Sequence, residues 1–235
     1  MQPSSDLLMH RFNSHIPITG IIHIGAGNCE ERFDYREMGV QKVLWIDGCT
    51  PFSSQTLVEA GFQHFVLHCW LSDIDDYETV YLTQMDSRND SIILPLGSQK
   101  EVVVTSTCQH MAKRLTTLLS EVMIDAHDYN TLVIDVQGSE LKVLDGCGTI
   151  LDYMDFVVSE CWQAPKDTDV PMCYETQPTT EQVTKVLNKH GLKETWCVYT
   201  VPGNGITERV ITYNLNAIPR NVQSLDILTE RHYGM

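Results

Sequence analysis

The chain has 235 residues, 43% hydrophobic and 20% charged, a balance typical of a globular protein rather than a disordered one. This length suffices for one α/β domain with a full core, and no apolar run resembles a membrane span or a signal peptide. The formal net charge of −15 comes from 31 acidic and 16 basic residues. Because so acidic a surface repels phosphates, we expect no nucleic-acid or membrane partner and favour a neutral or cationic acceptor.

The eight cysteines include no CxxC pair and no close Cys/His spacing of the kind that marks a metal cluster. Several lie inside apolar segments. This pattern is typical of free, mostly buried thiols in a reducing compartment. We therefore expect a cytoplasmic protein without a dedicated metal centre.

Short apolar runs alternate with helix-like stretches along the chain. In chain order, the pattern predicts strands at residues 20–25, 42–47, 63–68, 132–136 and 156–159, with helices at 29–38, 51–61, 138–144 and 179–190. Residues 193–201 and 208–213 are expected to form a closing antiparallel pair around the turn at 202–205. Buried strands separated by helices favour a parallel sheet covered on both faces.

The segment 77–107 breaks this alternation, with strands expected at 78–83 and 101–106 around a polar loop at 84–91. We interpret it as an insertion near the functional site. No linker or internal repeat is visible. The prediction is a single domain over 1–235, with a core at about 20–214, an N-terminal extension at 1–19 and a C-terminal tail at 215–235.

The first strand leads into a turn of small residues, Gly25, Ala26 and Gly27, ahead of a helix. Small residues allow a ligand to approach the backbone closely. Asp47 ends the next strand, 20 residues after Gly27, which is the spacing of a carboxylate that binds a ribose diol. Dinucleotide enzymes and methyltransferases share this layout.

Charge favours the second of these classes. The dinucleotide fingerprint G-x-G-x-x-G fails because its last glycine position is Glu30. Glu30 and Glu31 also place two negative charges where a pyrophosphate would bind. S-adenosylmethionine carries an ammonium and a sulfonium and no phosphate, so these acids are compatible with it.

Several further segments resemble FkbM-type S-adenosylmethionine-dependent methyltransferases. The resemblance covers about residues 20–213: the block IHIGAGNCEERFDYREMGVQKVLWIDGCTP, LSDIDD at 71–76, DSRNDSIIL at 86–94, RLTTLL at 114–119, IDVQGSELKVLDG at 134–146 and FVVSE at 156–160. The most specific is 134–146, which is similar to the family's D-V-Q-G-x-E-L-x-V-L-x-G. The sequence departs from the family pattern at Cys29 and Asp76, where glycine is usual, at Gly27, where His or Asn is usual, and at Thr117, where Asp is usual.

The resemblance implies a Rossmann-like methyltransferase fold: a mostly parallel seven-stranded sheet with an antiparallel closing strand and helices on both faces. It also implies O-methylation of a hydroxyl on a saccharide or small metabolite. Gly25, Ala26 and Gly27 would then line the methionine part of the donor and Asp47 would bind its ribose.

The same resemblance places Ser72 and Asp73 at the adenine edge of the donor. Asp135 and Glu160 end neighbouring strands and are the candidate catalytic carboxylates. Asp135 would bind the donor's ammonium, orient the acceptor or help to hold a metal. The pair would either share a divalent cation such as Mg²⁺, which lowers the pKa of an acceptor hydroxyl, or supply a general base.

Two alternatives remain open from the sequence. A NAD- or nucleotide-sugar-dependent oxidoreductase on a similar Rossmann sheet would need a glycine near position 30, where the chain has Glu30. A non-catalytic S-adenosylmethionine-binding protein would keep the fold and lose turnover.

Overall fold

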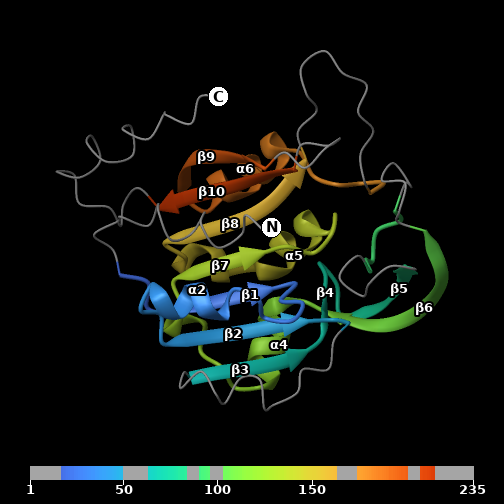
Figure 1. Cartoon of the computed structure of the whole chain (residues 1–235), viewed down its shortest axis with the longest axis horizontal. Helices are drawn as coiled ribbons and strands as arrows, with labels where there is room; N and C mark the ends of the chain where they lie inside the picture. Colours follow the sequence, from blue (N-terminus) through green and yellow to red (C-terminus); the bar gives the residue numbers. More distant parts are fainter. Residues whose placement is uncertain are drawn as a thin grey trace.

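A computed structural model of the chain describes residues 17–49, 63–83, 90–95, 103–162, 174–200 and 207–214. The main sheet has the strand order β3-β2-β1-β7-β8-β10-β9. Its strands are β1 (Ile21–Ile24), β2 (Lys42–Asp47), β3 (Gln63–His68), β7 (Thr131–Ile134), β8 (Phe156–Trp162), β9 (Leu192–Thr200) and β10 (Thr207–Asn214). The first five in this order pair in parallel, and β10 runs antiparallel to both β8 and β9. The sheet is therefore Rossmann-like, with a reversed strand at one side (Figure 1).

The central strands are apolar on both faces because the sheet is covered on both sides. All four residues of β1 are buried, and so are all four of β7. The register pairs Ile24 of β1 with Ile46 of β2 and with Ile134 of β7. These three strands consequently end together at one edge, which is where ligands bind in sheets of this kind.

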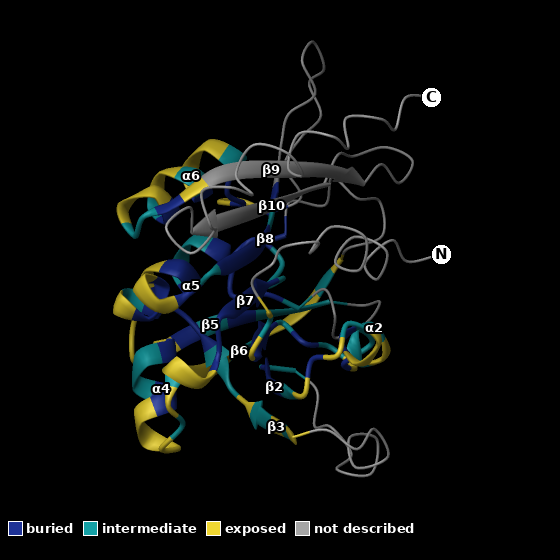
Figure 2. Ribbon diagram, turned by 90° about the vertical axis from the view of Figure 1, so that its left-hand side faces the viewer, coloured by how far each residue is buried: buried dark blue, intermediate teal, exposed yellow. Residues whose placement is uncertain are grey.

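Helices flank the sheet. The described ones are α2 (Arg32–Glu37), α4 (Leu115–Glu121), α5 (Glu140–Cys147) and α6 (Thr180–Lys189), with the short 3-10 helices η2 (Ala126–Asp128) and η3 (Gly148–Tyr153). Figure 2 shows α4, α5 and α6 on one side of the sheet and α2 on the other, with the buried residues between these layers. The larger core cluster joins the sheet to the helices α4, α5 and α6 through residues such as Leu118, Val143 and Leu187.

A second, three-stranded sheet has the order β4-β6-β5 and is made of β4 (Trp70–Leu71), β5 (Asp76–Thr83) and β6 (Val104–Lys113). Strand β4 pairs with β6 in parallel and β5 pairs with β6 antiparallel. Figure 1 shows this sheet beyond the ends of β2 and β3. The described residues of the main sheet form five adjacent parallel strands followed by the β10–β9 pair, in agreement with the predicted mostly parallel sheet that has an antiparallel strand. The prediction of a single sheet is corrected by this separate mixed sheet.

The second sheet was not predicted as a sheet because buried and exposed residues alternate only weakly along β6. Most of its residues are exposed, so the sequence carries little period-2 pattern. Helix α4 was also not predicted as a helix. Its start is set by a contact from afar: Asp75 accepts hydrogen bonds from the Arg114 amide and the Thr117 hydroxyl, each at 2.9 Å. The amide hydrogen bond is also the main reason that the pKa of Asp75 is lowered.

Other sequence predictions have mixed outcomes. Helix α2 begins at Arg32 rather than at Cys29, so Glu30 and Glu31 lie in the turn before the helix. Helix α6 is confirmed, and Thr179 forms a capping box with Gln182 at its start. Four predicted segments lie wholly or mostly outside the described residues: the helix at 51–61, residues 84–89 of the loop at 84–91, the tail at 215–235 and most of the extension at 1–19.

The cysteines described by the structure are free, as predicted: Cys29, Cys147 and Cys161 are buried, and Cys49, Cys69 and Cys108 are partly buried. Burial raises the pKa of the Cys69 thiol to about 11, so this thiol stays protonated at neutral pH. Among the helices in the described ranges, none has the length and apolar character needed to cross a bilayer.

Candidate functional site

A cavity of about 340 Å³ opens at the carboxyl ends of β1, β2 and β7. This volume is within the range of small-molecule sites. Its lining includes five residues that the sequence predicted as ligand contacts: Gly25, Ala26, Gly27, Asp47 and Asp135. Asp135 lies more than 100 residues after the turn of Gly25, Ala26 and Gly27, so the parallel register is what brings them together.

Gly25 leaves β1 with a φ of +80°, a backbone conformation that side chains disfavour. Its amide donates to the Ile46 carbonyl at 2.9 Å, which holds the turn against β2. A Cβ atom at this position would lie 1.7 Å from the carbonyl oxygen of Asp135. Glycine is therefore required here by both the dihedral angle and the close approach of the two strand ends.

Asp47 ends β2 and is only 9% exposed. One carboxylate oxygen accepts a hydrogen bond from the Gly27 amide at 2.8 Å, and the other accepts one from the Cys49 amide at 2.7 Å. These two bonds fix the plane of the carboxylate at the wall of the cavity.

Cys29 occupies the turn position where the FkbM-type pattern has glycine, and its φ is +53°. Its amide donates to the Ala26 carbonyl at 2.7 Å, and its side chain is buried in the smaller core cluster. The FkbM-type pattern has glycine at this position because the backbone here is left-handed, a conformation that glycine adopts easily. In this chain a buried cysteine adopts the same conformation, and its burial offsets the strain.

The turn after β7 carries a relay of side-chain hydrogen bonds. Gln137 donates through Nε2 to Oδ1 of Asp135 at 2.9 Å, and the Tyr174 hydroxyl donates to Oε1 of Gln137 at 3.0 Å. Gln137 has a φ of +55°, which is unusual for a residue other than glycine. Asp135 and Gln137 both line the cavity. The side chain of Gln137 therefore orients the Asp135 carboxylate, a role that the sequence did not predict.

Glu140 is 1% exposed and turns back over the amides that precede its own helix. Its Oε1 accepts from the Gly138 amide at 3.1 Å and from the Val136 amide at 3.3 Å. Burial is the main cause that raises the pKa of this carboxyl to about 7, and the nearby Asp135 charge adds to the shift. From sequence, a first-turn acid is explained by the helix dipole alone, so the role of Glu140 was missed.

The segment 90–95, which lies between β5 and β6 of the second sheet, forms another wall. Asp90 lines the cavity, and its Oδ1 accepts hydrogen bonds from the Thr83 amide at 2.7 Å and the Thr83 hydroxyl at 3.1 Å. The Ser91 hydroxyl donates to the Gln137 carbonyl at 2.8 Å. The second sheet therefore contributes a carboxylate to the cavity and a contact to the turn after β7.

The charged side chains described in the cavity lining are all acidic. Within the described part of the chain, the cavity is lined by five carboxylates and by no lysine, arginine or histidine; the acids are Glu30, Glu31, Asp47, Asp90 and Asp135. Burial, together with Asp47 and Asp90, raises the pKa of the Cys49 thiol well above its usual range. That thiol is therefore neutral and adds no further negative charge to the lining. Such a lining favours a cationic ligand and disfavours phosphates.

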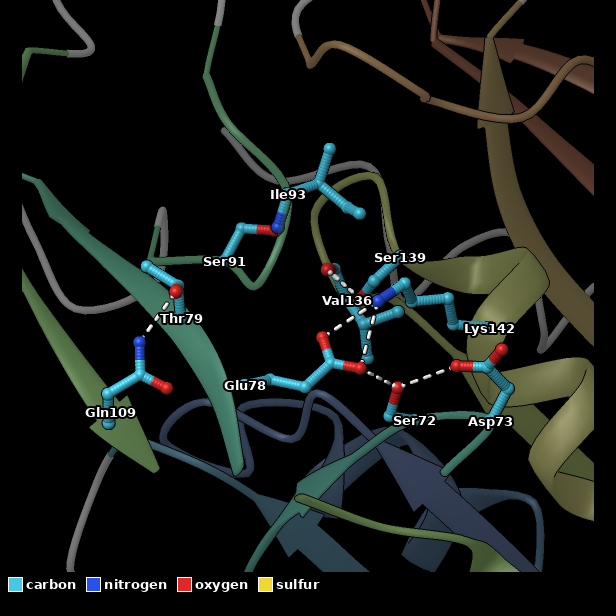
Figure 3. A network of polar contacts seen from close by, with 10 residues as sticks. All are labelled: Ser72, Asp73, Glu78, Thr79, Ser91, Ile93, Gln109, Val136, Ser139 and Lys142. Carbon is cyan, nitrogen blue, oxygen red and sulfur yellow. Dashed lines mark hydrogen bonds and ion pairs between the residues drawn. The ribbon is translucent and has the colours of Figure 1, made fainter. Parts of the chain in front are cut away.

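Ser72, Asp73 and Glu160, which the sequence placed at the site, are not among the described residues that line the cavity. Ser72 is fully buried, and its hydroxyl lies 2.6 Å from Glu78 Oε1 and 3.0 Å from Asp73 Oδ1 (Figure 3). Lys142 completes this network with two contacts to Glu78, at 2.7 and 2.9 Å. Ser72 and Asp73 thus belong to a network in which the Glu78–Lys142 contact ties the second sheet to α5, and their contact with adenine stays a prediction.

Glu160 is partly buried on β8, in register with Arg209 of β10. The described residues contain no group of three or more His, Cys, Asp or Glu side chains placed to hold a metal ion, so Asp135 and Glu160 do not form part of such a group there. Of the aromatic residues near the site, Trp70 lines the cavity and packs over the backbone of Gly48.

Similarity to known proteins is confined to distant structures. No protein-family model matches the sequence, and no curated protein matches it. The methyltransferase SibL is 12% identical, with a TM-score of 0.46 over 89% of this chain and 54% of SibL, so the chain spans about half of that protein. The magnesium protoporphyrin IX methyltransferase ChlM from Synechocystis is 11% identical, with a TM-score of 0.45 over 82% of this chain and 72% of ChlM.

A third structure is a 1,6-didemethyltoxoflavin-N1-methyltransferase from Burkholderia thailandensis with bound S-adenosylhomocysteine. It is 10% identical, with a TM-score of 0.45 over 90% of this chain and 76% of that protein. Likenesses of this size assign no residue roles and no substrate. The function must therefore be argued from the cavity of this chain.

Proposed function

We propose that the chain is an S-adenosylmethionine-dependent O-methyltransferase that transfers a methyl group to a hydroxyl of a saccharide or small metabolite. The observation that carries the proposal is the acidic cavity at the carboxyl ends of β1, β2 and β7, with Asp47 hydrogen-bonded to the amide of Gly27 in its wall. The sequence resemblance to FkbM-type methyltransferases supports the finer assignment to O-methylation.

The chemistry of the lining fits the donor. S-adenosylmethionine carries a sulfonium and an ammonium beside one carboxylate, so its net charge is positive and it has no phosphate. The five carboxylates in the described lining attract such a ligand. The same carboxylates would repel the pyrophosphate of NAD or of a nucleotide sugar, which argues against an oxidoreductase of this fold.

The residues that would hold the donor follow from their places in the cavity. Asp47 would accept hydrogen bonds from the ribose hydroxyls, and the turn of Gly25, Ala26 and Gly27 would lie against the methionine part. Asp135, oriented by Gln137, would bind the ammonium or the acceptor hydroxyl. We also retain Ser72 and Asp73 as proposed adenine contacts and Glu160 as a proposed catalytic carboxylate.

When bound, S-adenosylmethionine supplies an activated methyl group. The task of the chain is then to bring the acceptor oxygen close to it and in line with the bond that breaks. A carboxylate of Asp135 in hydrogen-bond reach of the acceptor hydroxyl would accept its proton as the methyl group is transferred. Trp70 offers an aromatic face in the cavity wall, against which a sugar ring can stack.

The test is calorimetry of the full chain with S-adenosylmethionine, S-adenosylhomocysteine, NAD and a nucleotide sugar. We expect saturable binding of the first two and none of the others. Binding of NAD without binding of the methyl donor would overturn the proposal. A screen of hydroxylated acceptors with labelled donor then tests turnover. Donor binding without methyl transfer to any acceptor would favour the non-catalytic alternative.

A further inference from the structure

Side chains hold four backbone groups of the turn that connects β7 to α5. The Val136 and Gly138 amides donate to Glu140, the Val136 carbonyl accepts from the Ser139 hydroxyl at 2.9 Å, and the Gln137 carbonyl accepts from Ser91. Figure 3 shows Ser139 beside Val136 at the start of α5. This turn contains two successive residues with positive φ, Gln137 at +55° and Gly138 at +98°. Such a conformation persists only where the surroundings impose it.

The other side of the turn faces the cavity. Asp135, Val136, Gln137 and Ser139 all line it. Gly138 cannot be replaced by a larger residue without a clash, because a Cβ there would lie 2.7 Å from the Cβ of Tyr174. The geometry of these five residues therefore decides where the Asp135 carboxylate and the Gln137 amide lie in the cavity.

The burial of the Glu140 carboxyl, which places it on the turn, destabilises the folded state. Glu140 is 1% exposed, and its Oε2 atom has no hydrogen-bond partner in the part of the chain that the structure describes. A carboxyl buried with one oxygen unsatisfied destabilises the folded state relative to an apolar side chain of similar size. An acid that only complemented the helix dipole would lie at the surface, as Glu181 does in the first turn of α6.

We propose that Glu140 is a positioning residue of this cavity: its Oε1 atom clamps the Val136 and Gly138 amides and thereby holds Asp135 and Gln137 in place for the ligand. The inference rests on the proposed function only for the identity of the ligand. The clamp itself is a property of the ligand-free chain.

Glu140 acts through a single oxygen that accepts two hydrogen bonds. Glutamine can supply the same acceptor at the same length, with an amide group in place of the unpartnered Oε2. Aspartate keeps the acidic charge in the first turn and lacks one methylene of reach. Leucine removes both acceptor and charge. These three variants therefore separate a clamp from a charge effect.

The experiment compares Glu140→Gln, Glu140→Asp and Glu140→Leu in the full chain. Glu181→Leu is the control, since it removes a first-turn acid that is exposed. Two quantities are measured: hydrogen exchange of peptides that cover residues 135–139 without ligand, and the affinity for S-adenosylhomocysteine. We expect Glu140→Gln to keep both, whereas Glu140→Asp and Glu140→Leu lose exchange protection and bind about tenfold or more weakly. Glu181→Leu should change neither.

Circular dichroism at the working temperature establishes which variants are folded. If Glu140→Leu does not fold, the Gln and Asp variants decide, because each differs from the wild type by one group. The clamp would be overturned if Glu140→Asp behaves as wild type while Glu140→Gln loses exchange protection. That result would show that the negative charge at position 140, and not its two hydrogen bonds, holds the turn. Unchanged exchange and affinity in Glu140→Leu would also overturn the clamp. If the wild type itself fails to bind S-adenosylhomocysteine, the proposed function fails, and the exchange data still decide the clamp.

Discussion

The amide of Gly27 donates a hydrogen bond to the carboxylate of Asp47 at 2.8 Å, across the ends of two neighbouring parallel strands. The two residues lie 20 positions apart. The contact converts a spacing visible in the sequence into a fixed geometry: the turn after β1 and the acid after β2 become one wall of the cavity. A ligand that contacts one of these residues is therefore close to the other.

Replacing Asp47 tests this wall. We expect Asp47→Ala to weaken binding of S-adenosylhomocysteine by about tenfold to a hundredfold, since hydrogen bonds to a charged group contribute about 1.5–3 kcal/mol. Asp152→Ala is the control, because Asp152 is an exposed aspartate outside the cavity lining. Calorimetry of both variants measures the change. An unchanged affinity in Asp47→Ala would show that the ribose is not bound there.

Alanine substitutions at two glycines with nearly the same φ angle distinguish backbone strain from steric clash. Gly25 and Gly39 have φ angles of +80° and +79°, but a Cβ at Gly39 would meet nothing within 4 Å, whereas one at Gly25 would meet the Asp135 carbonyl. We expect Gly39→Ala to cost about 1 kcal/mol. Gly25→Ala should cost more than about 3 kcal/mol, because two strand ends must separate. Urea unfolding measures both, and equal losses would contradict the close approach.

The burial of Glu140 predicts a pH dependence of stability. Its pKa is raised to about 7 in the folded chain, so between about 4.5 and 7 the folded state binds more protons than the unfolded state. The free energy of unfolding of the wild type should therefore fall as the pH rises through this window. Glu140→Gln does not titrate there, so its stability relative to wild type should rise by up to about 3 kcal/mol between pH 5 and pH 8. Parallel urea curves at the two pH values measure the difference, and a constant difference would contradict a raised pKa.

The Glu78–Lys142 pair predicts a modest stability loss. Glu78 is 9% exposed, and Lys142 is 35% exposed, so solvent screens part of the interaction. We expect Lys142→Met to lower the free energy of unfolding by about 2 kcal/mol, since it leaves a nearly buried carboxylate with only Ser72 as its described partner. Lys113→Met breaks the more exposed pair with Glu121 and should cost clearly less than Lys142→Met. Equal costs in the two variants would show that burial of Glu78 contributes nothing.

The two candidate catalytic carboxylates differ in position. Asp135 lines the cavity and Glu160 is not among its described lining residues. Once an acceptor is identified, we expect Asp135→Asn to lower kcat by about a hundredfold or more, the range of general acid–base catalysis. Glu160→Gln should also lower kcat if it takes part in the reaction, with donor affinity nearly intact. A Glu160→Gln enzyme with full turnover would remove Glu160 from the mechanism.

Much of the main sheet could be predicted because its strands carry their own signal. Continuous apolar runs such as KVLWID indicate strands buried on both faces, and the structure places β2 at those six residues. Gly25, Ala26, Gly27, Asp47 and Asp135 follow such strands directly, and the structure brings all five to one cavity. That these residues lie together could be predicted because carboxyl ends of parallel strands meet at one edge whatever the side chains are; that they bind a ligand stays a prediction.

Local sequence by itself therefore determined the parallel strands, the glycine turn and the acids at the strand ends. Only the tertiary structure decided the rest: that the segment between β5 and β6 brings Asp90 to the cavity and Ser91 to the turn after β7, that Ser72 bonds to Glu78 and to Asp73, and that Glu140 is buried beneath a strained turn. The physical reason is the range of the interactions. A buried strand is encoded by its own apolar residues, whereas the partner of a buried polar group is set by which distant segment packs against it.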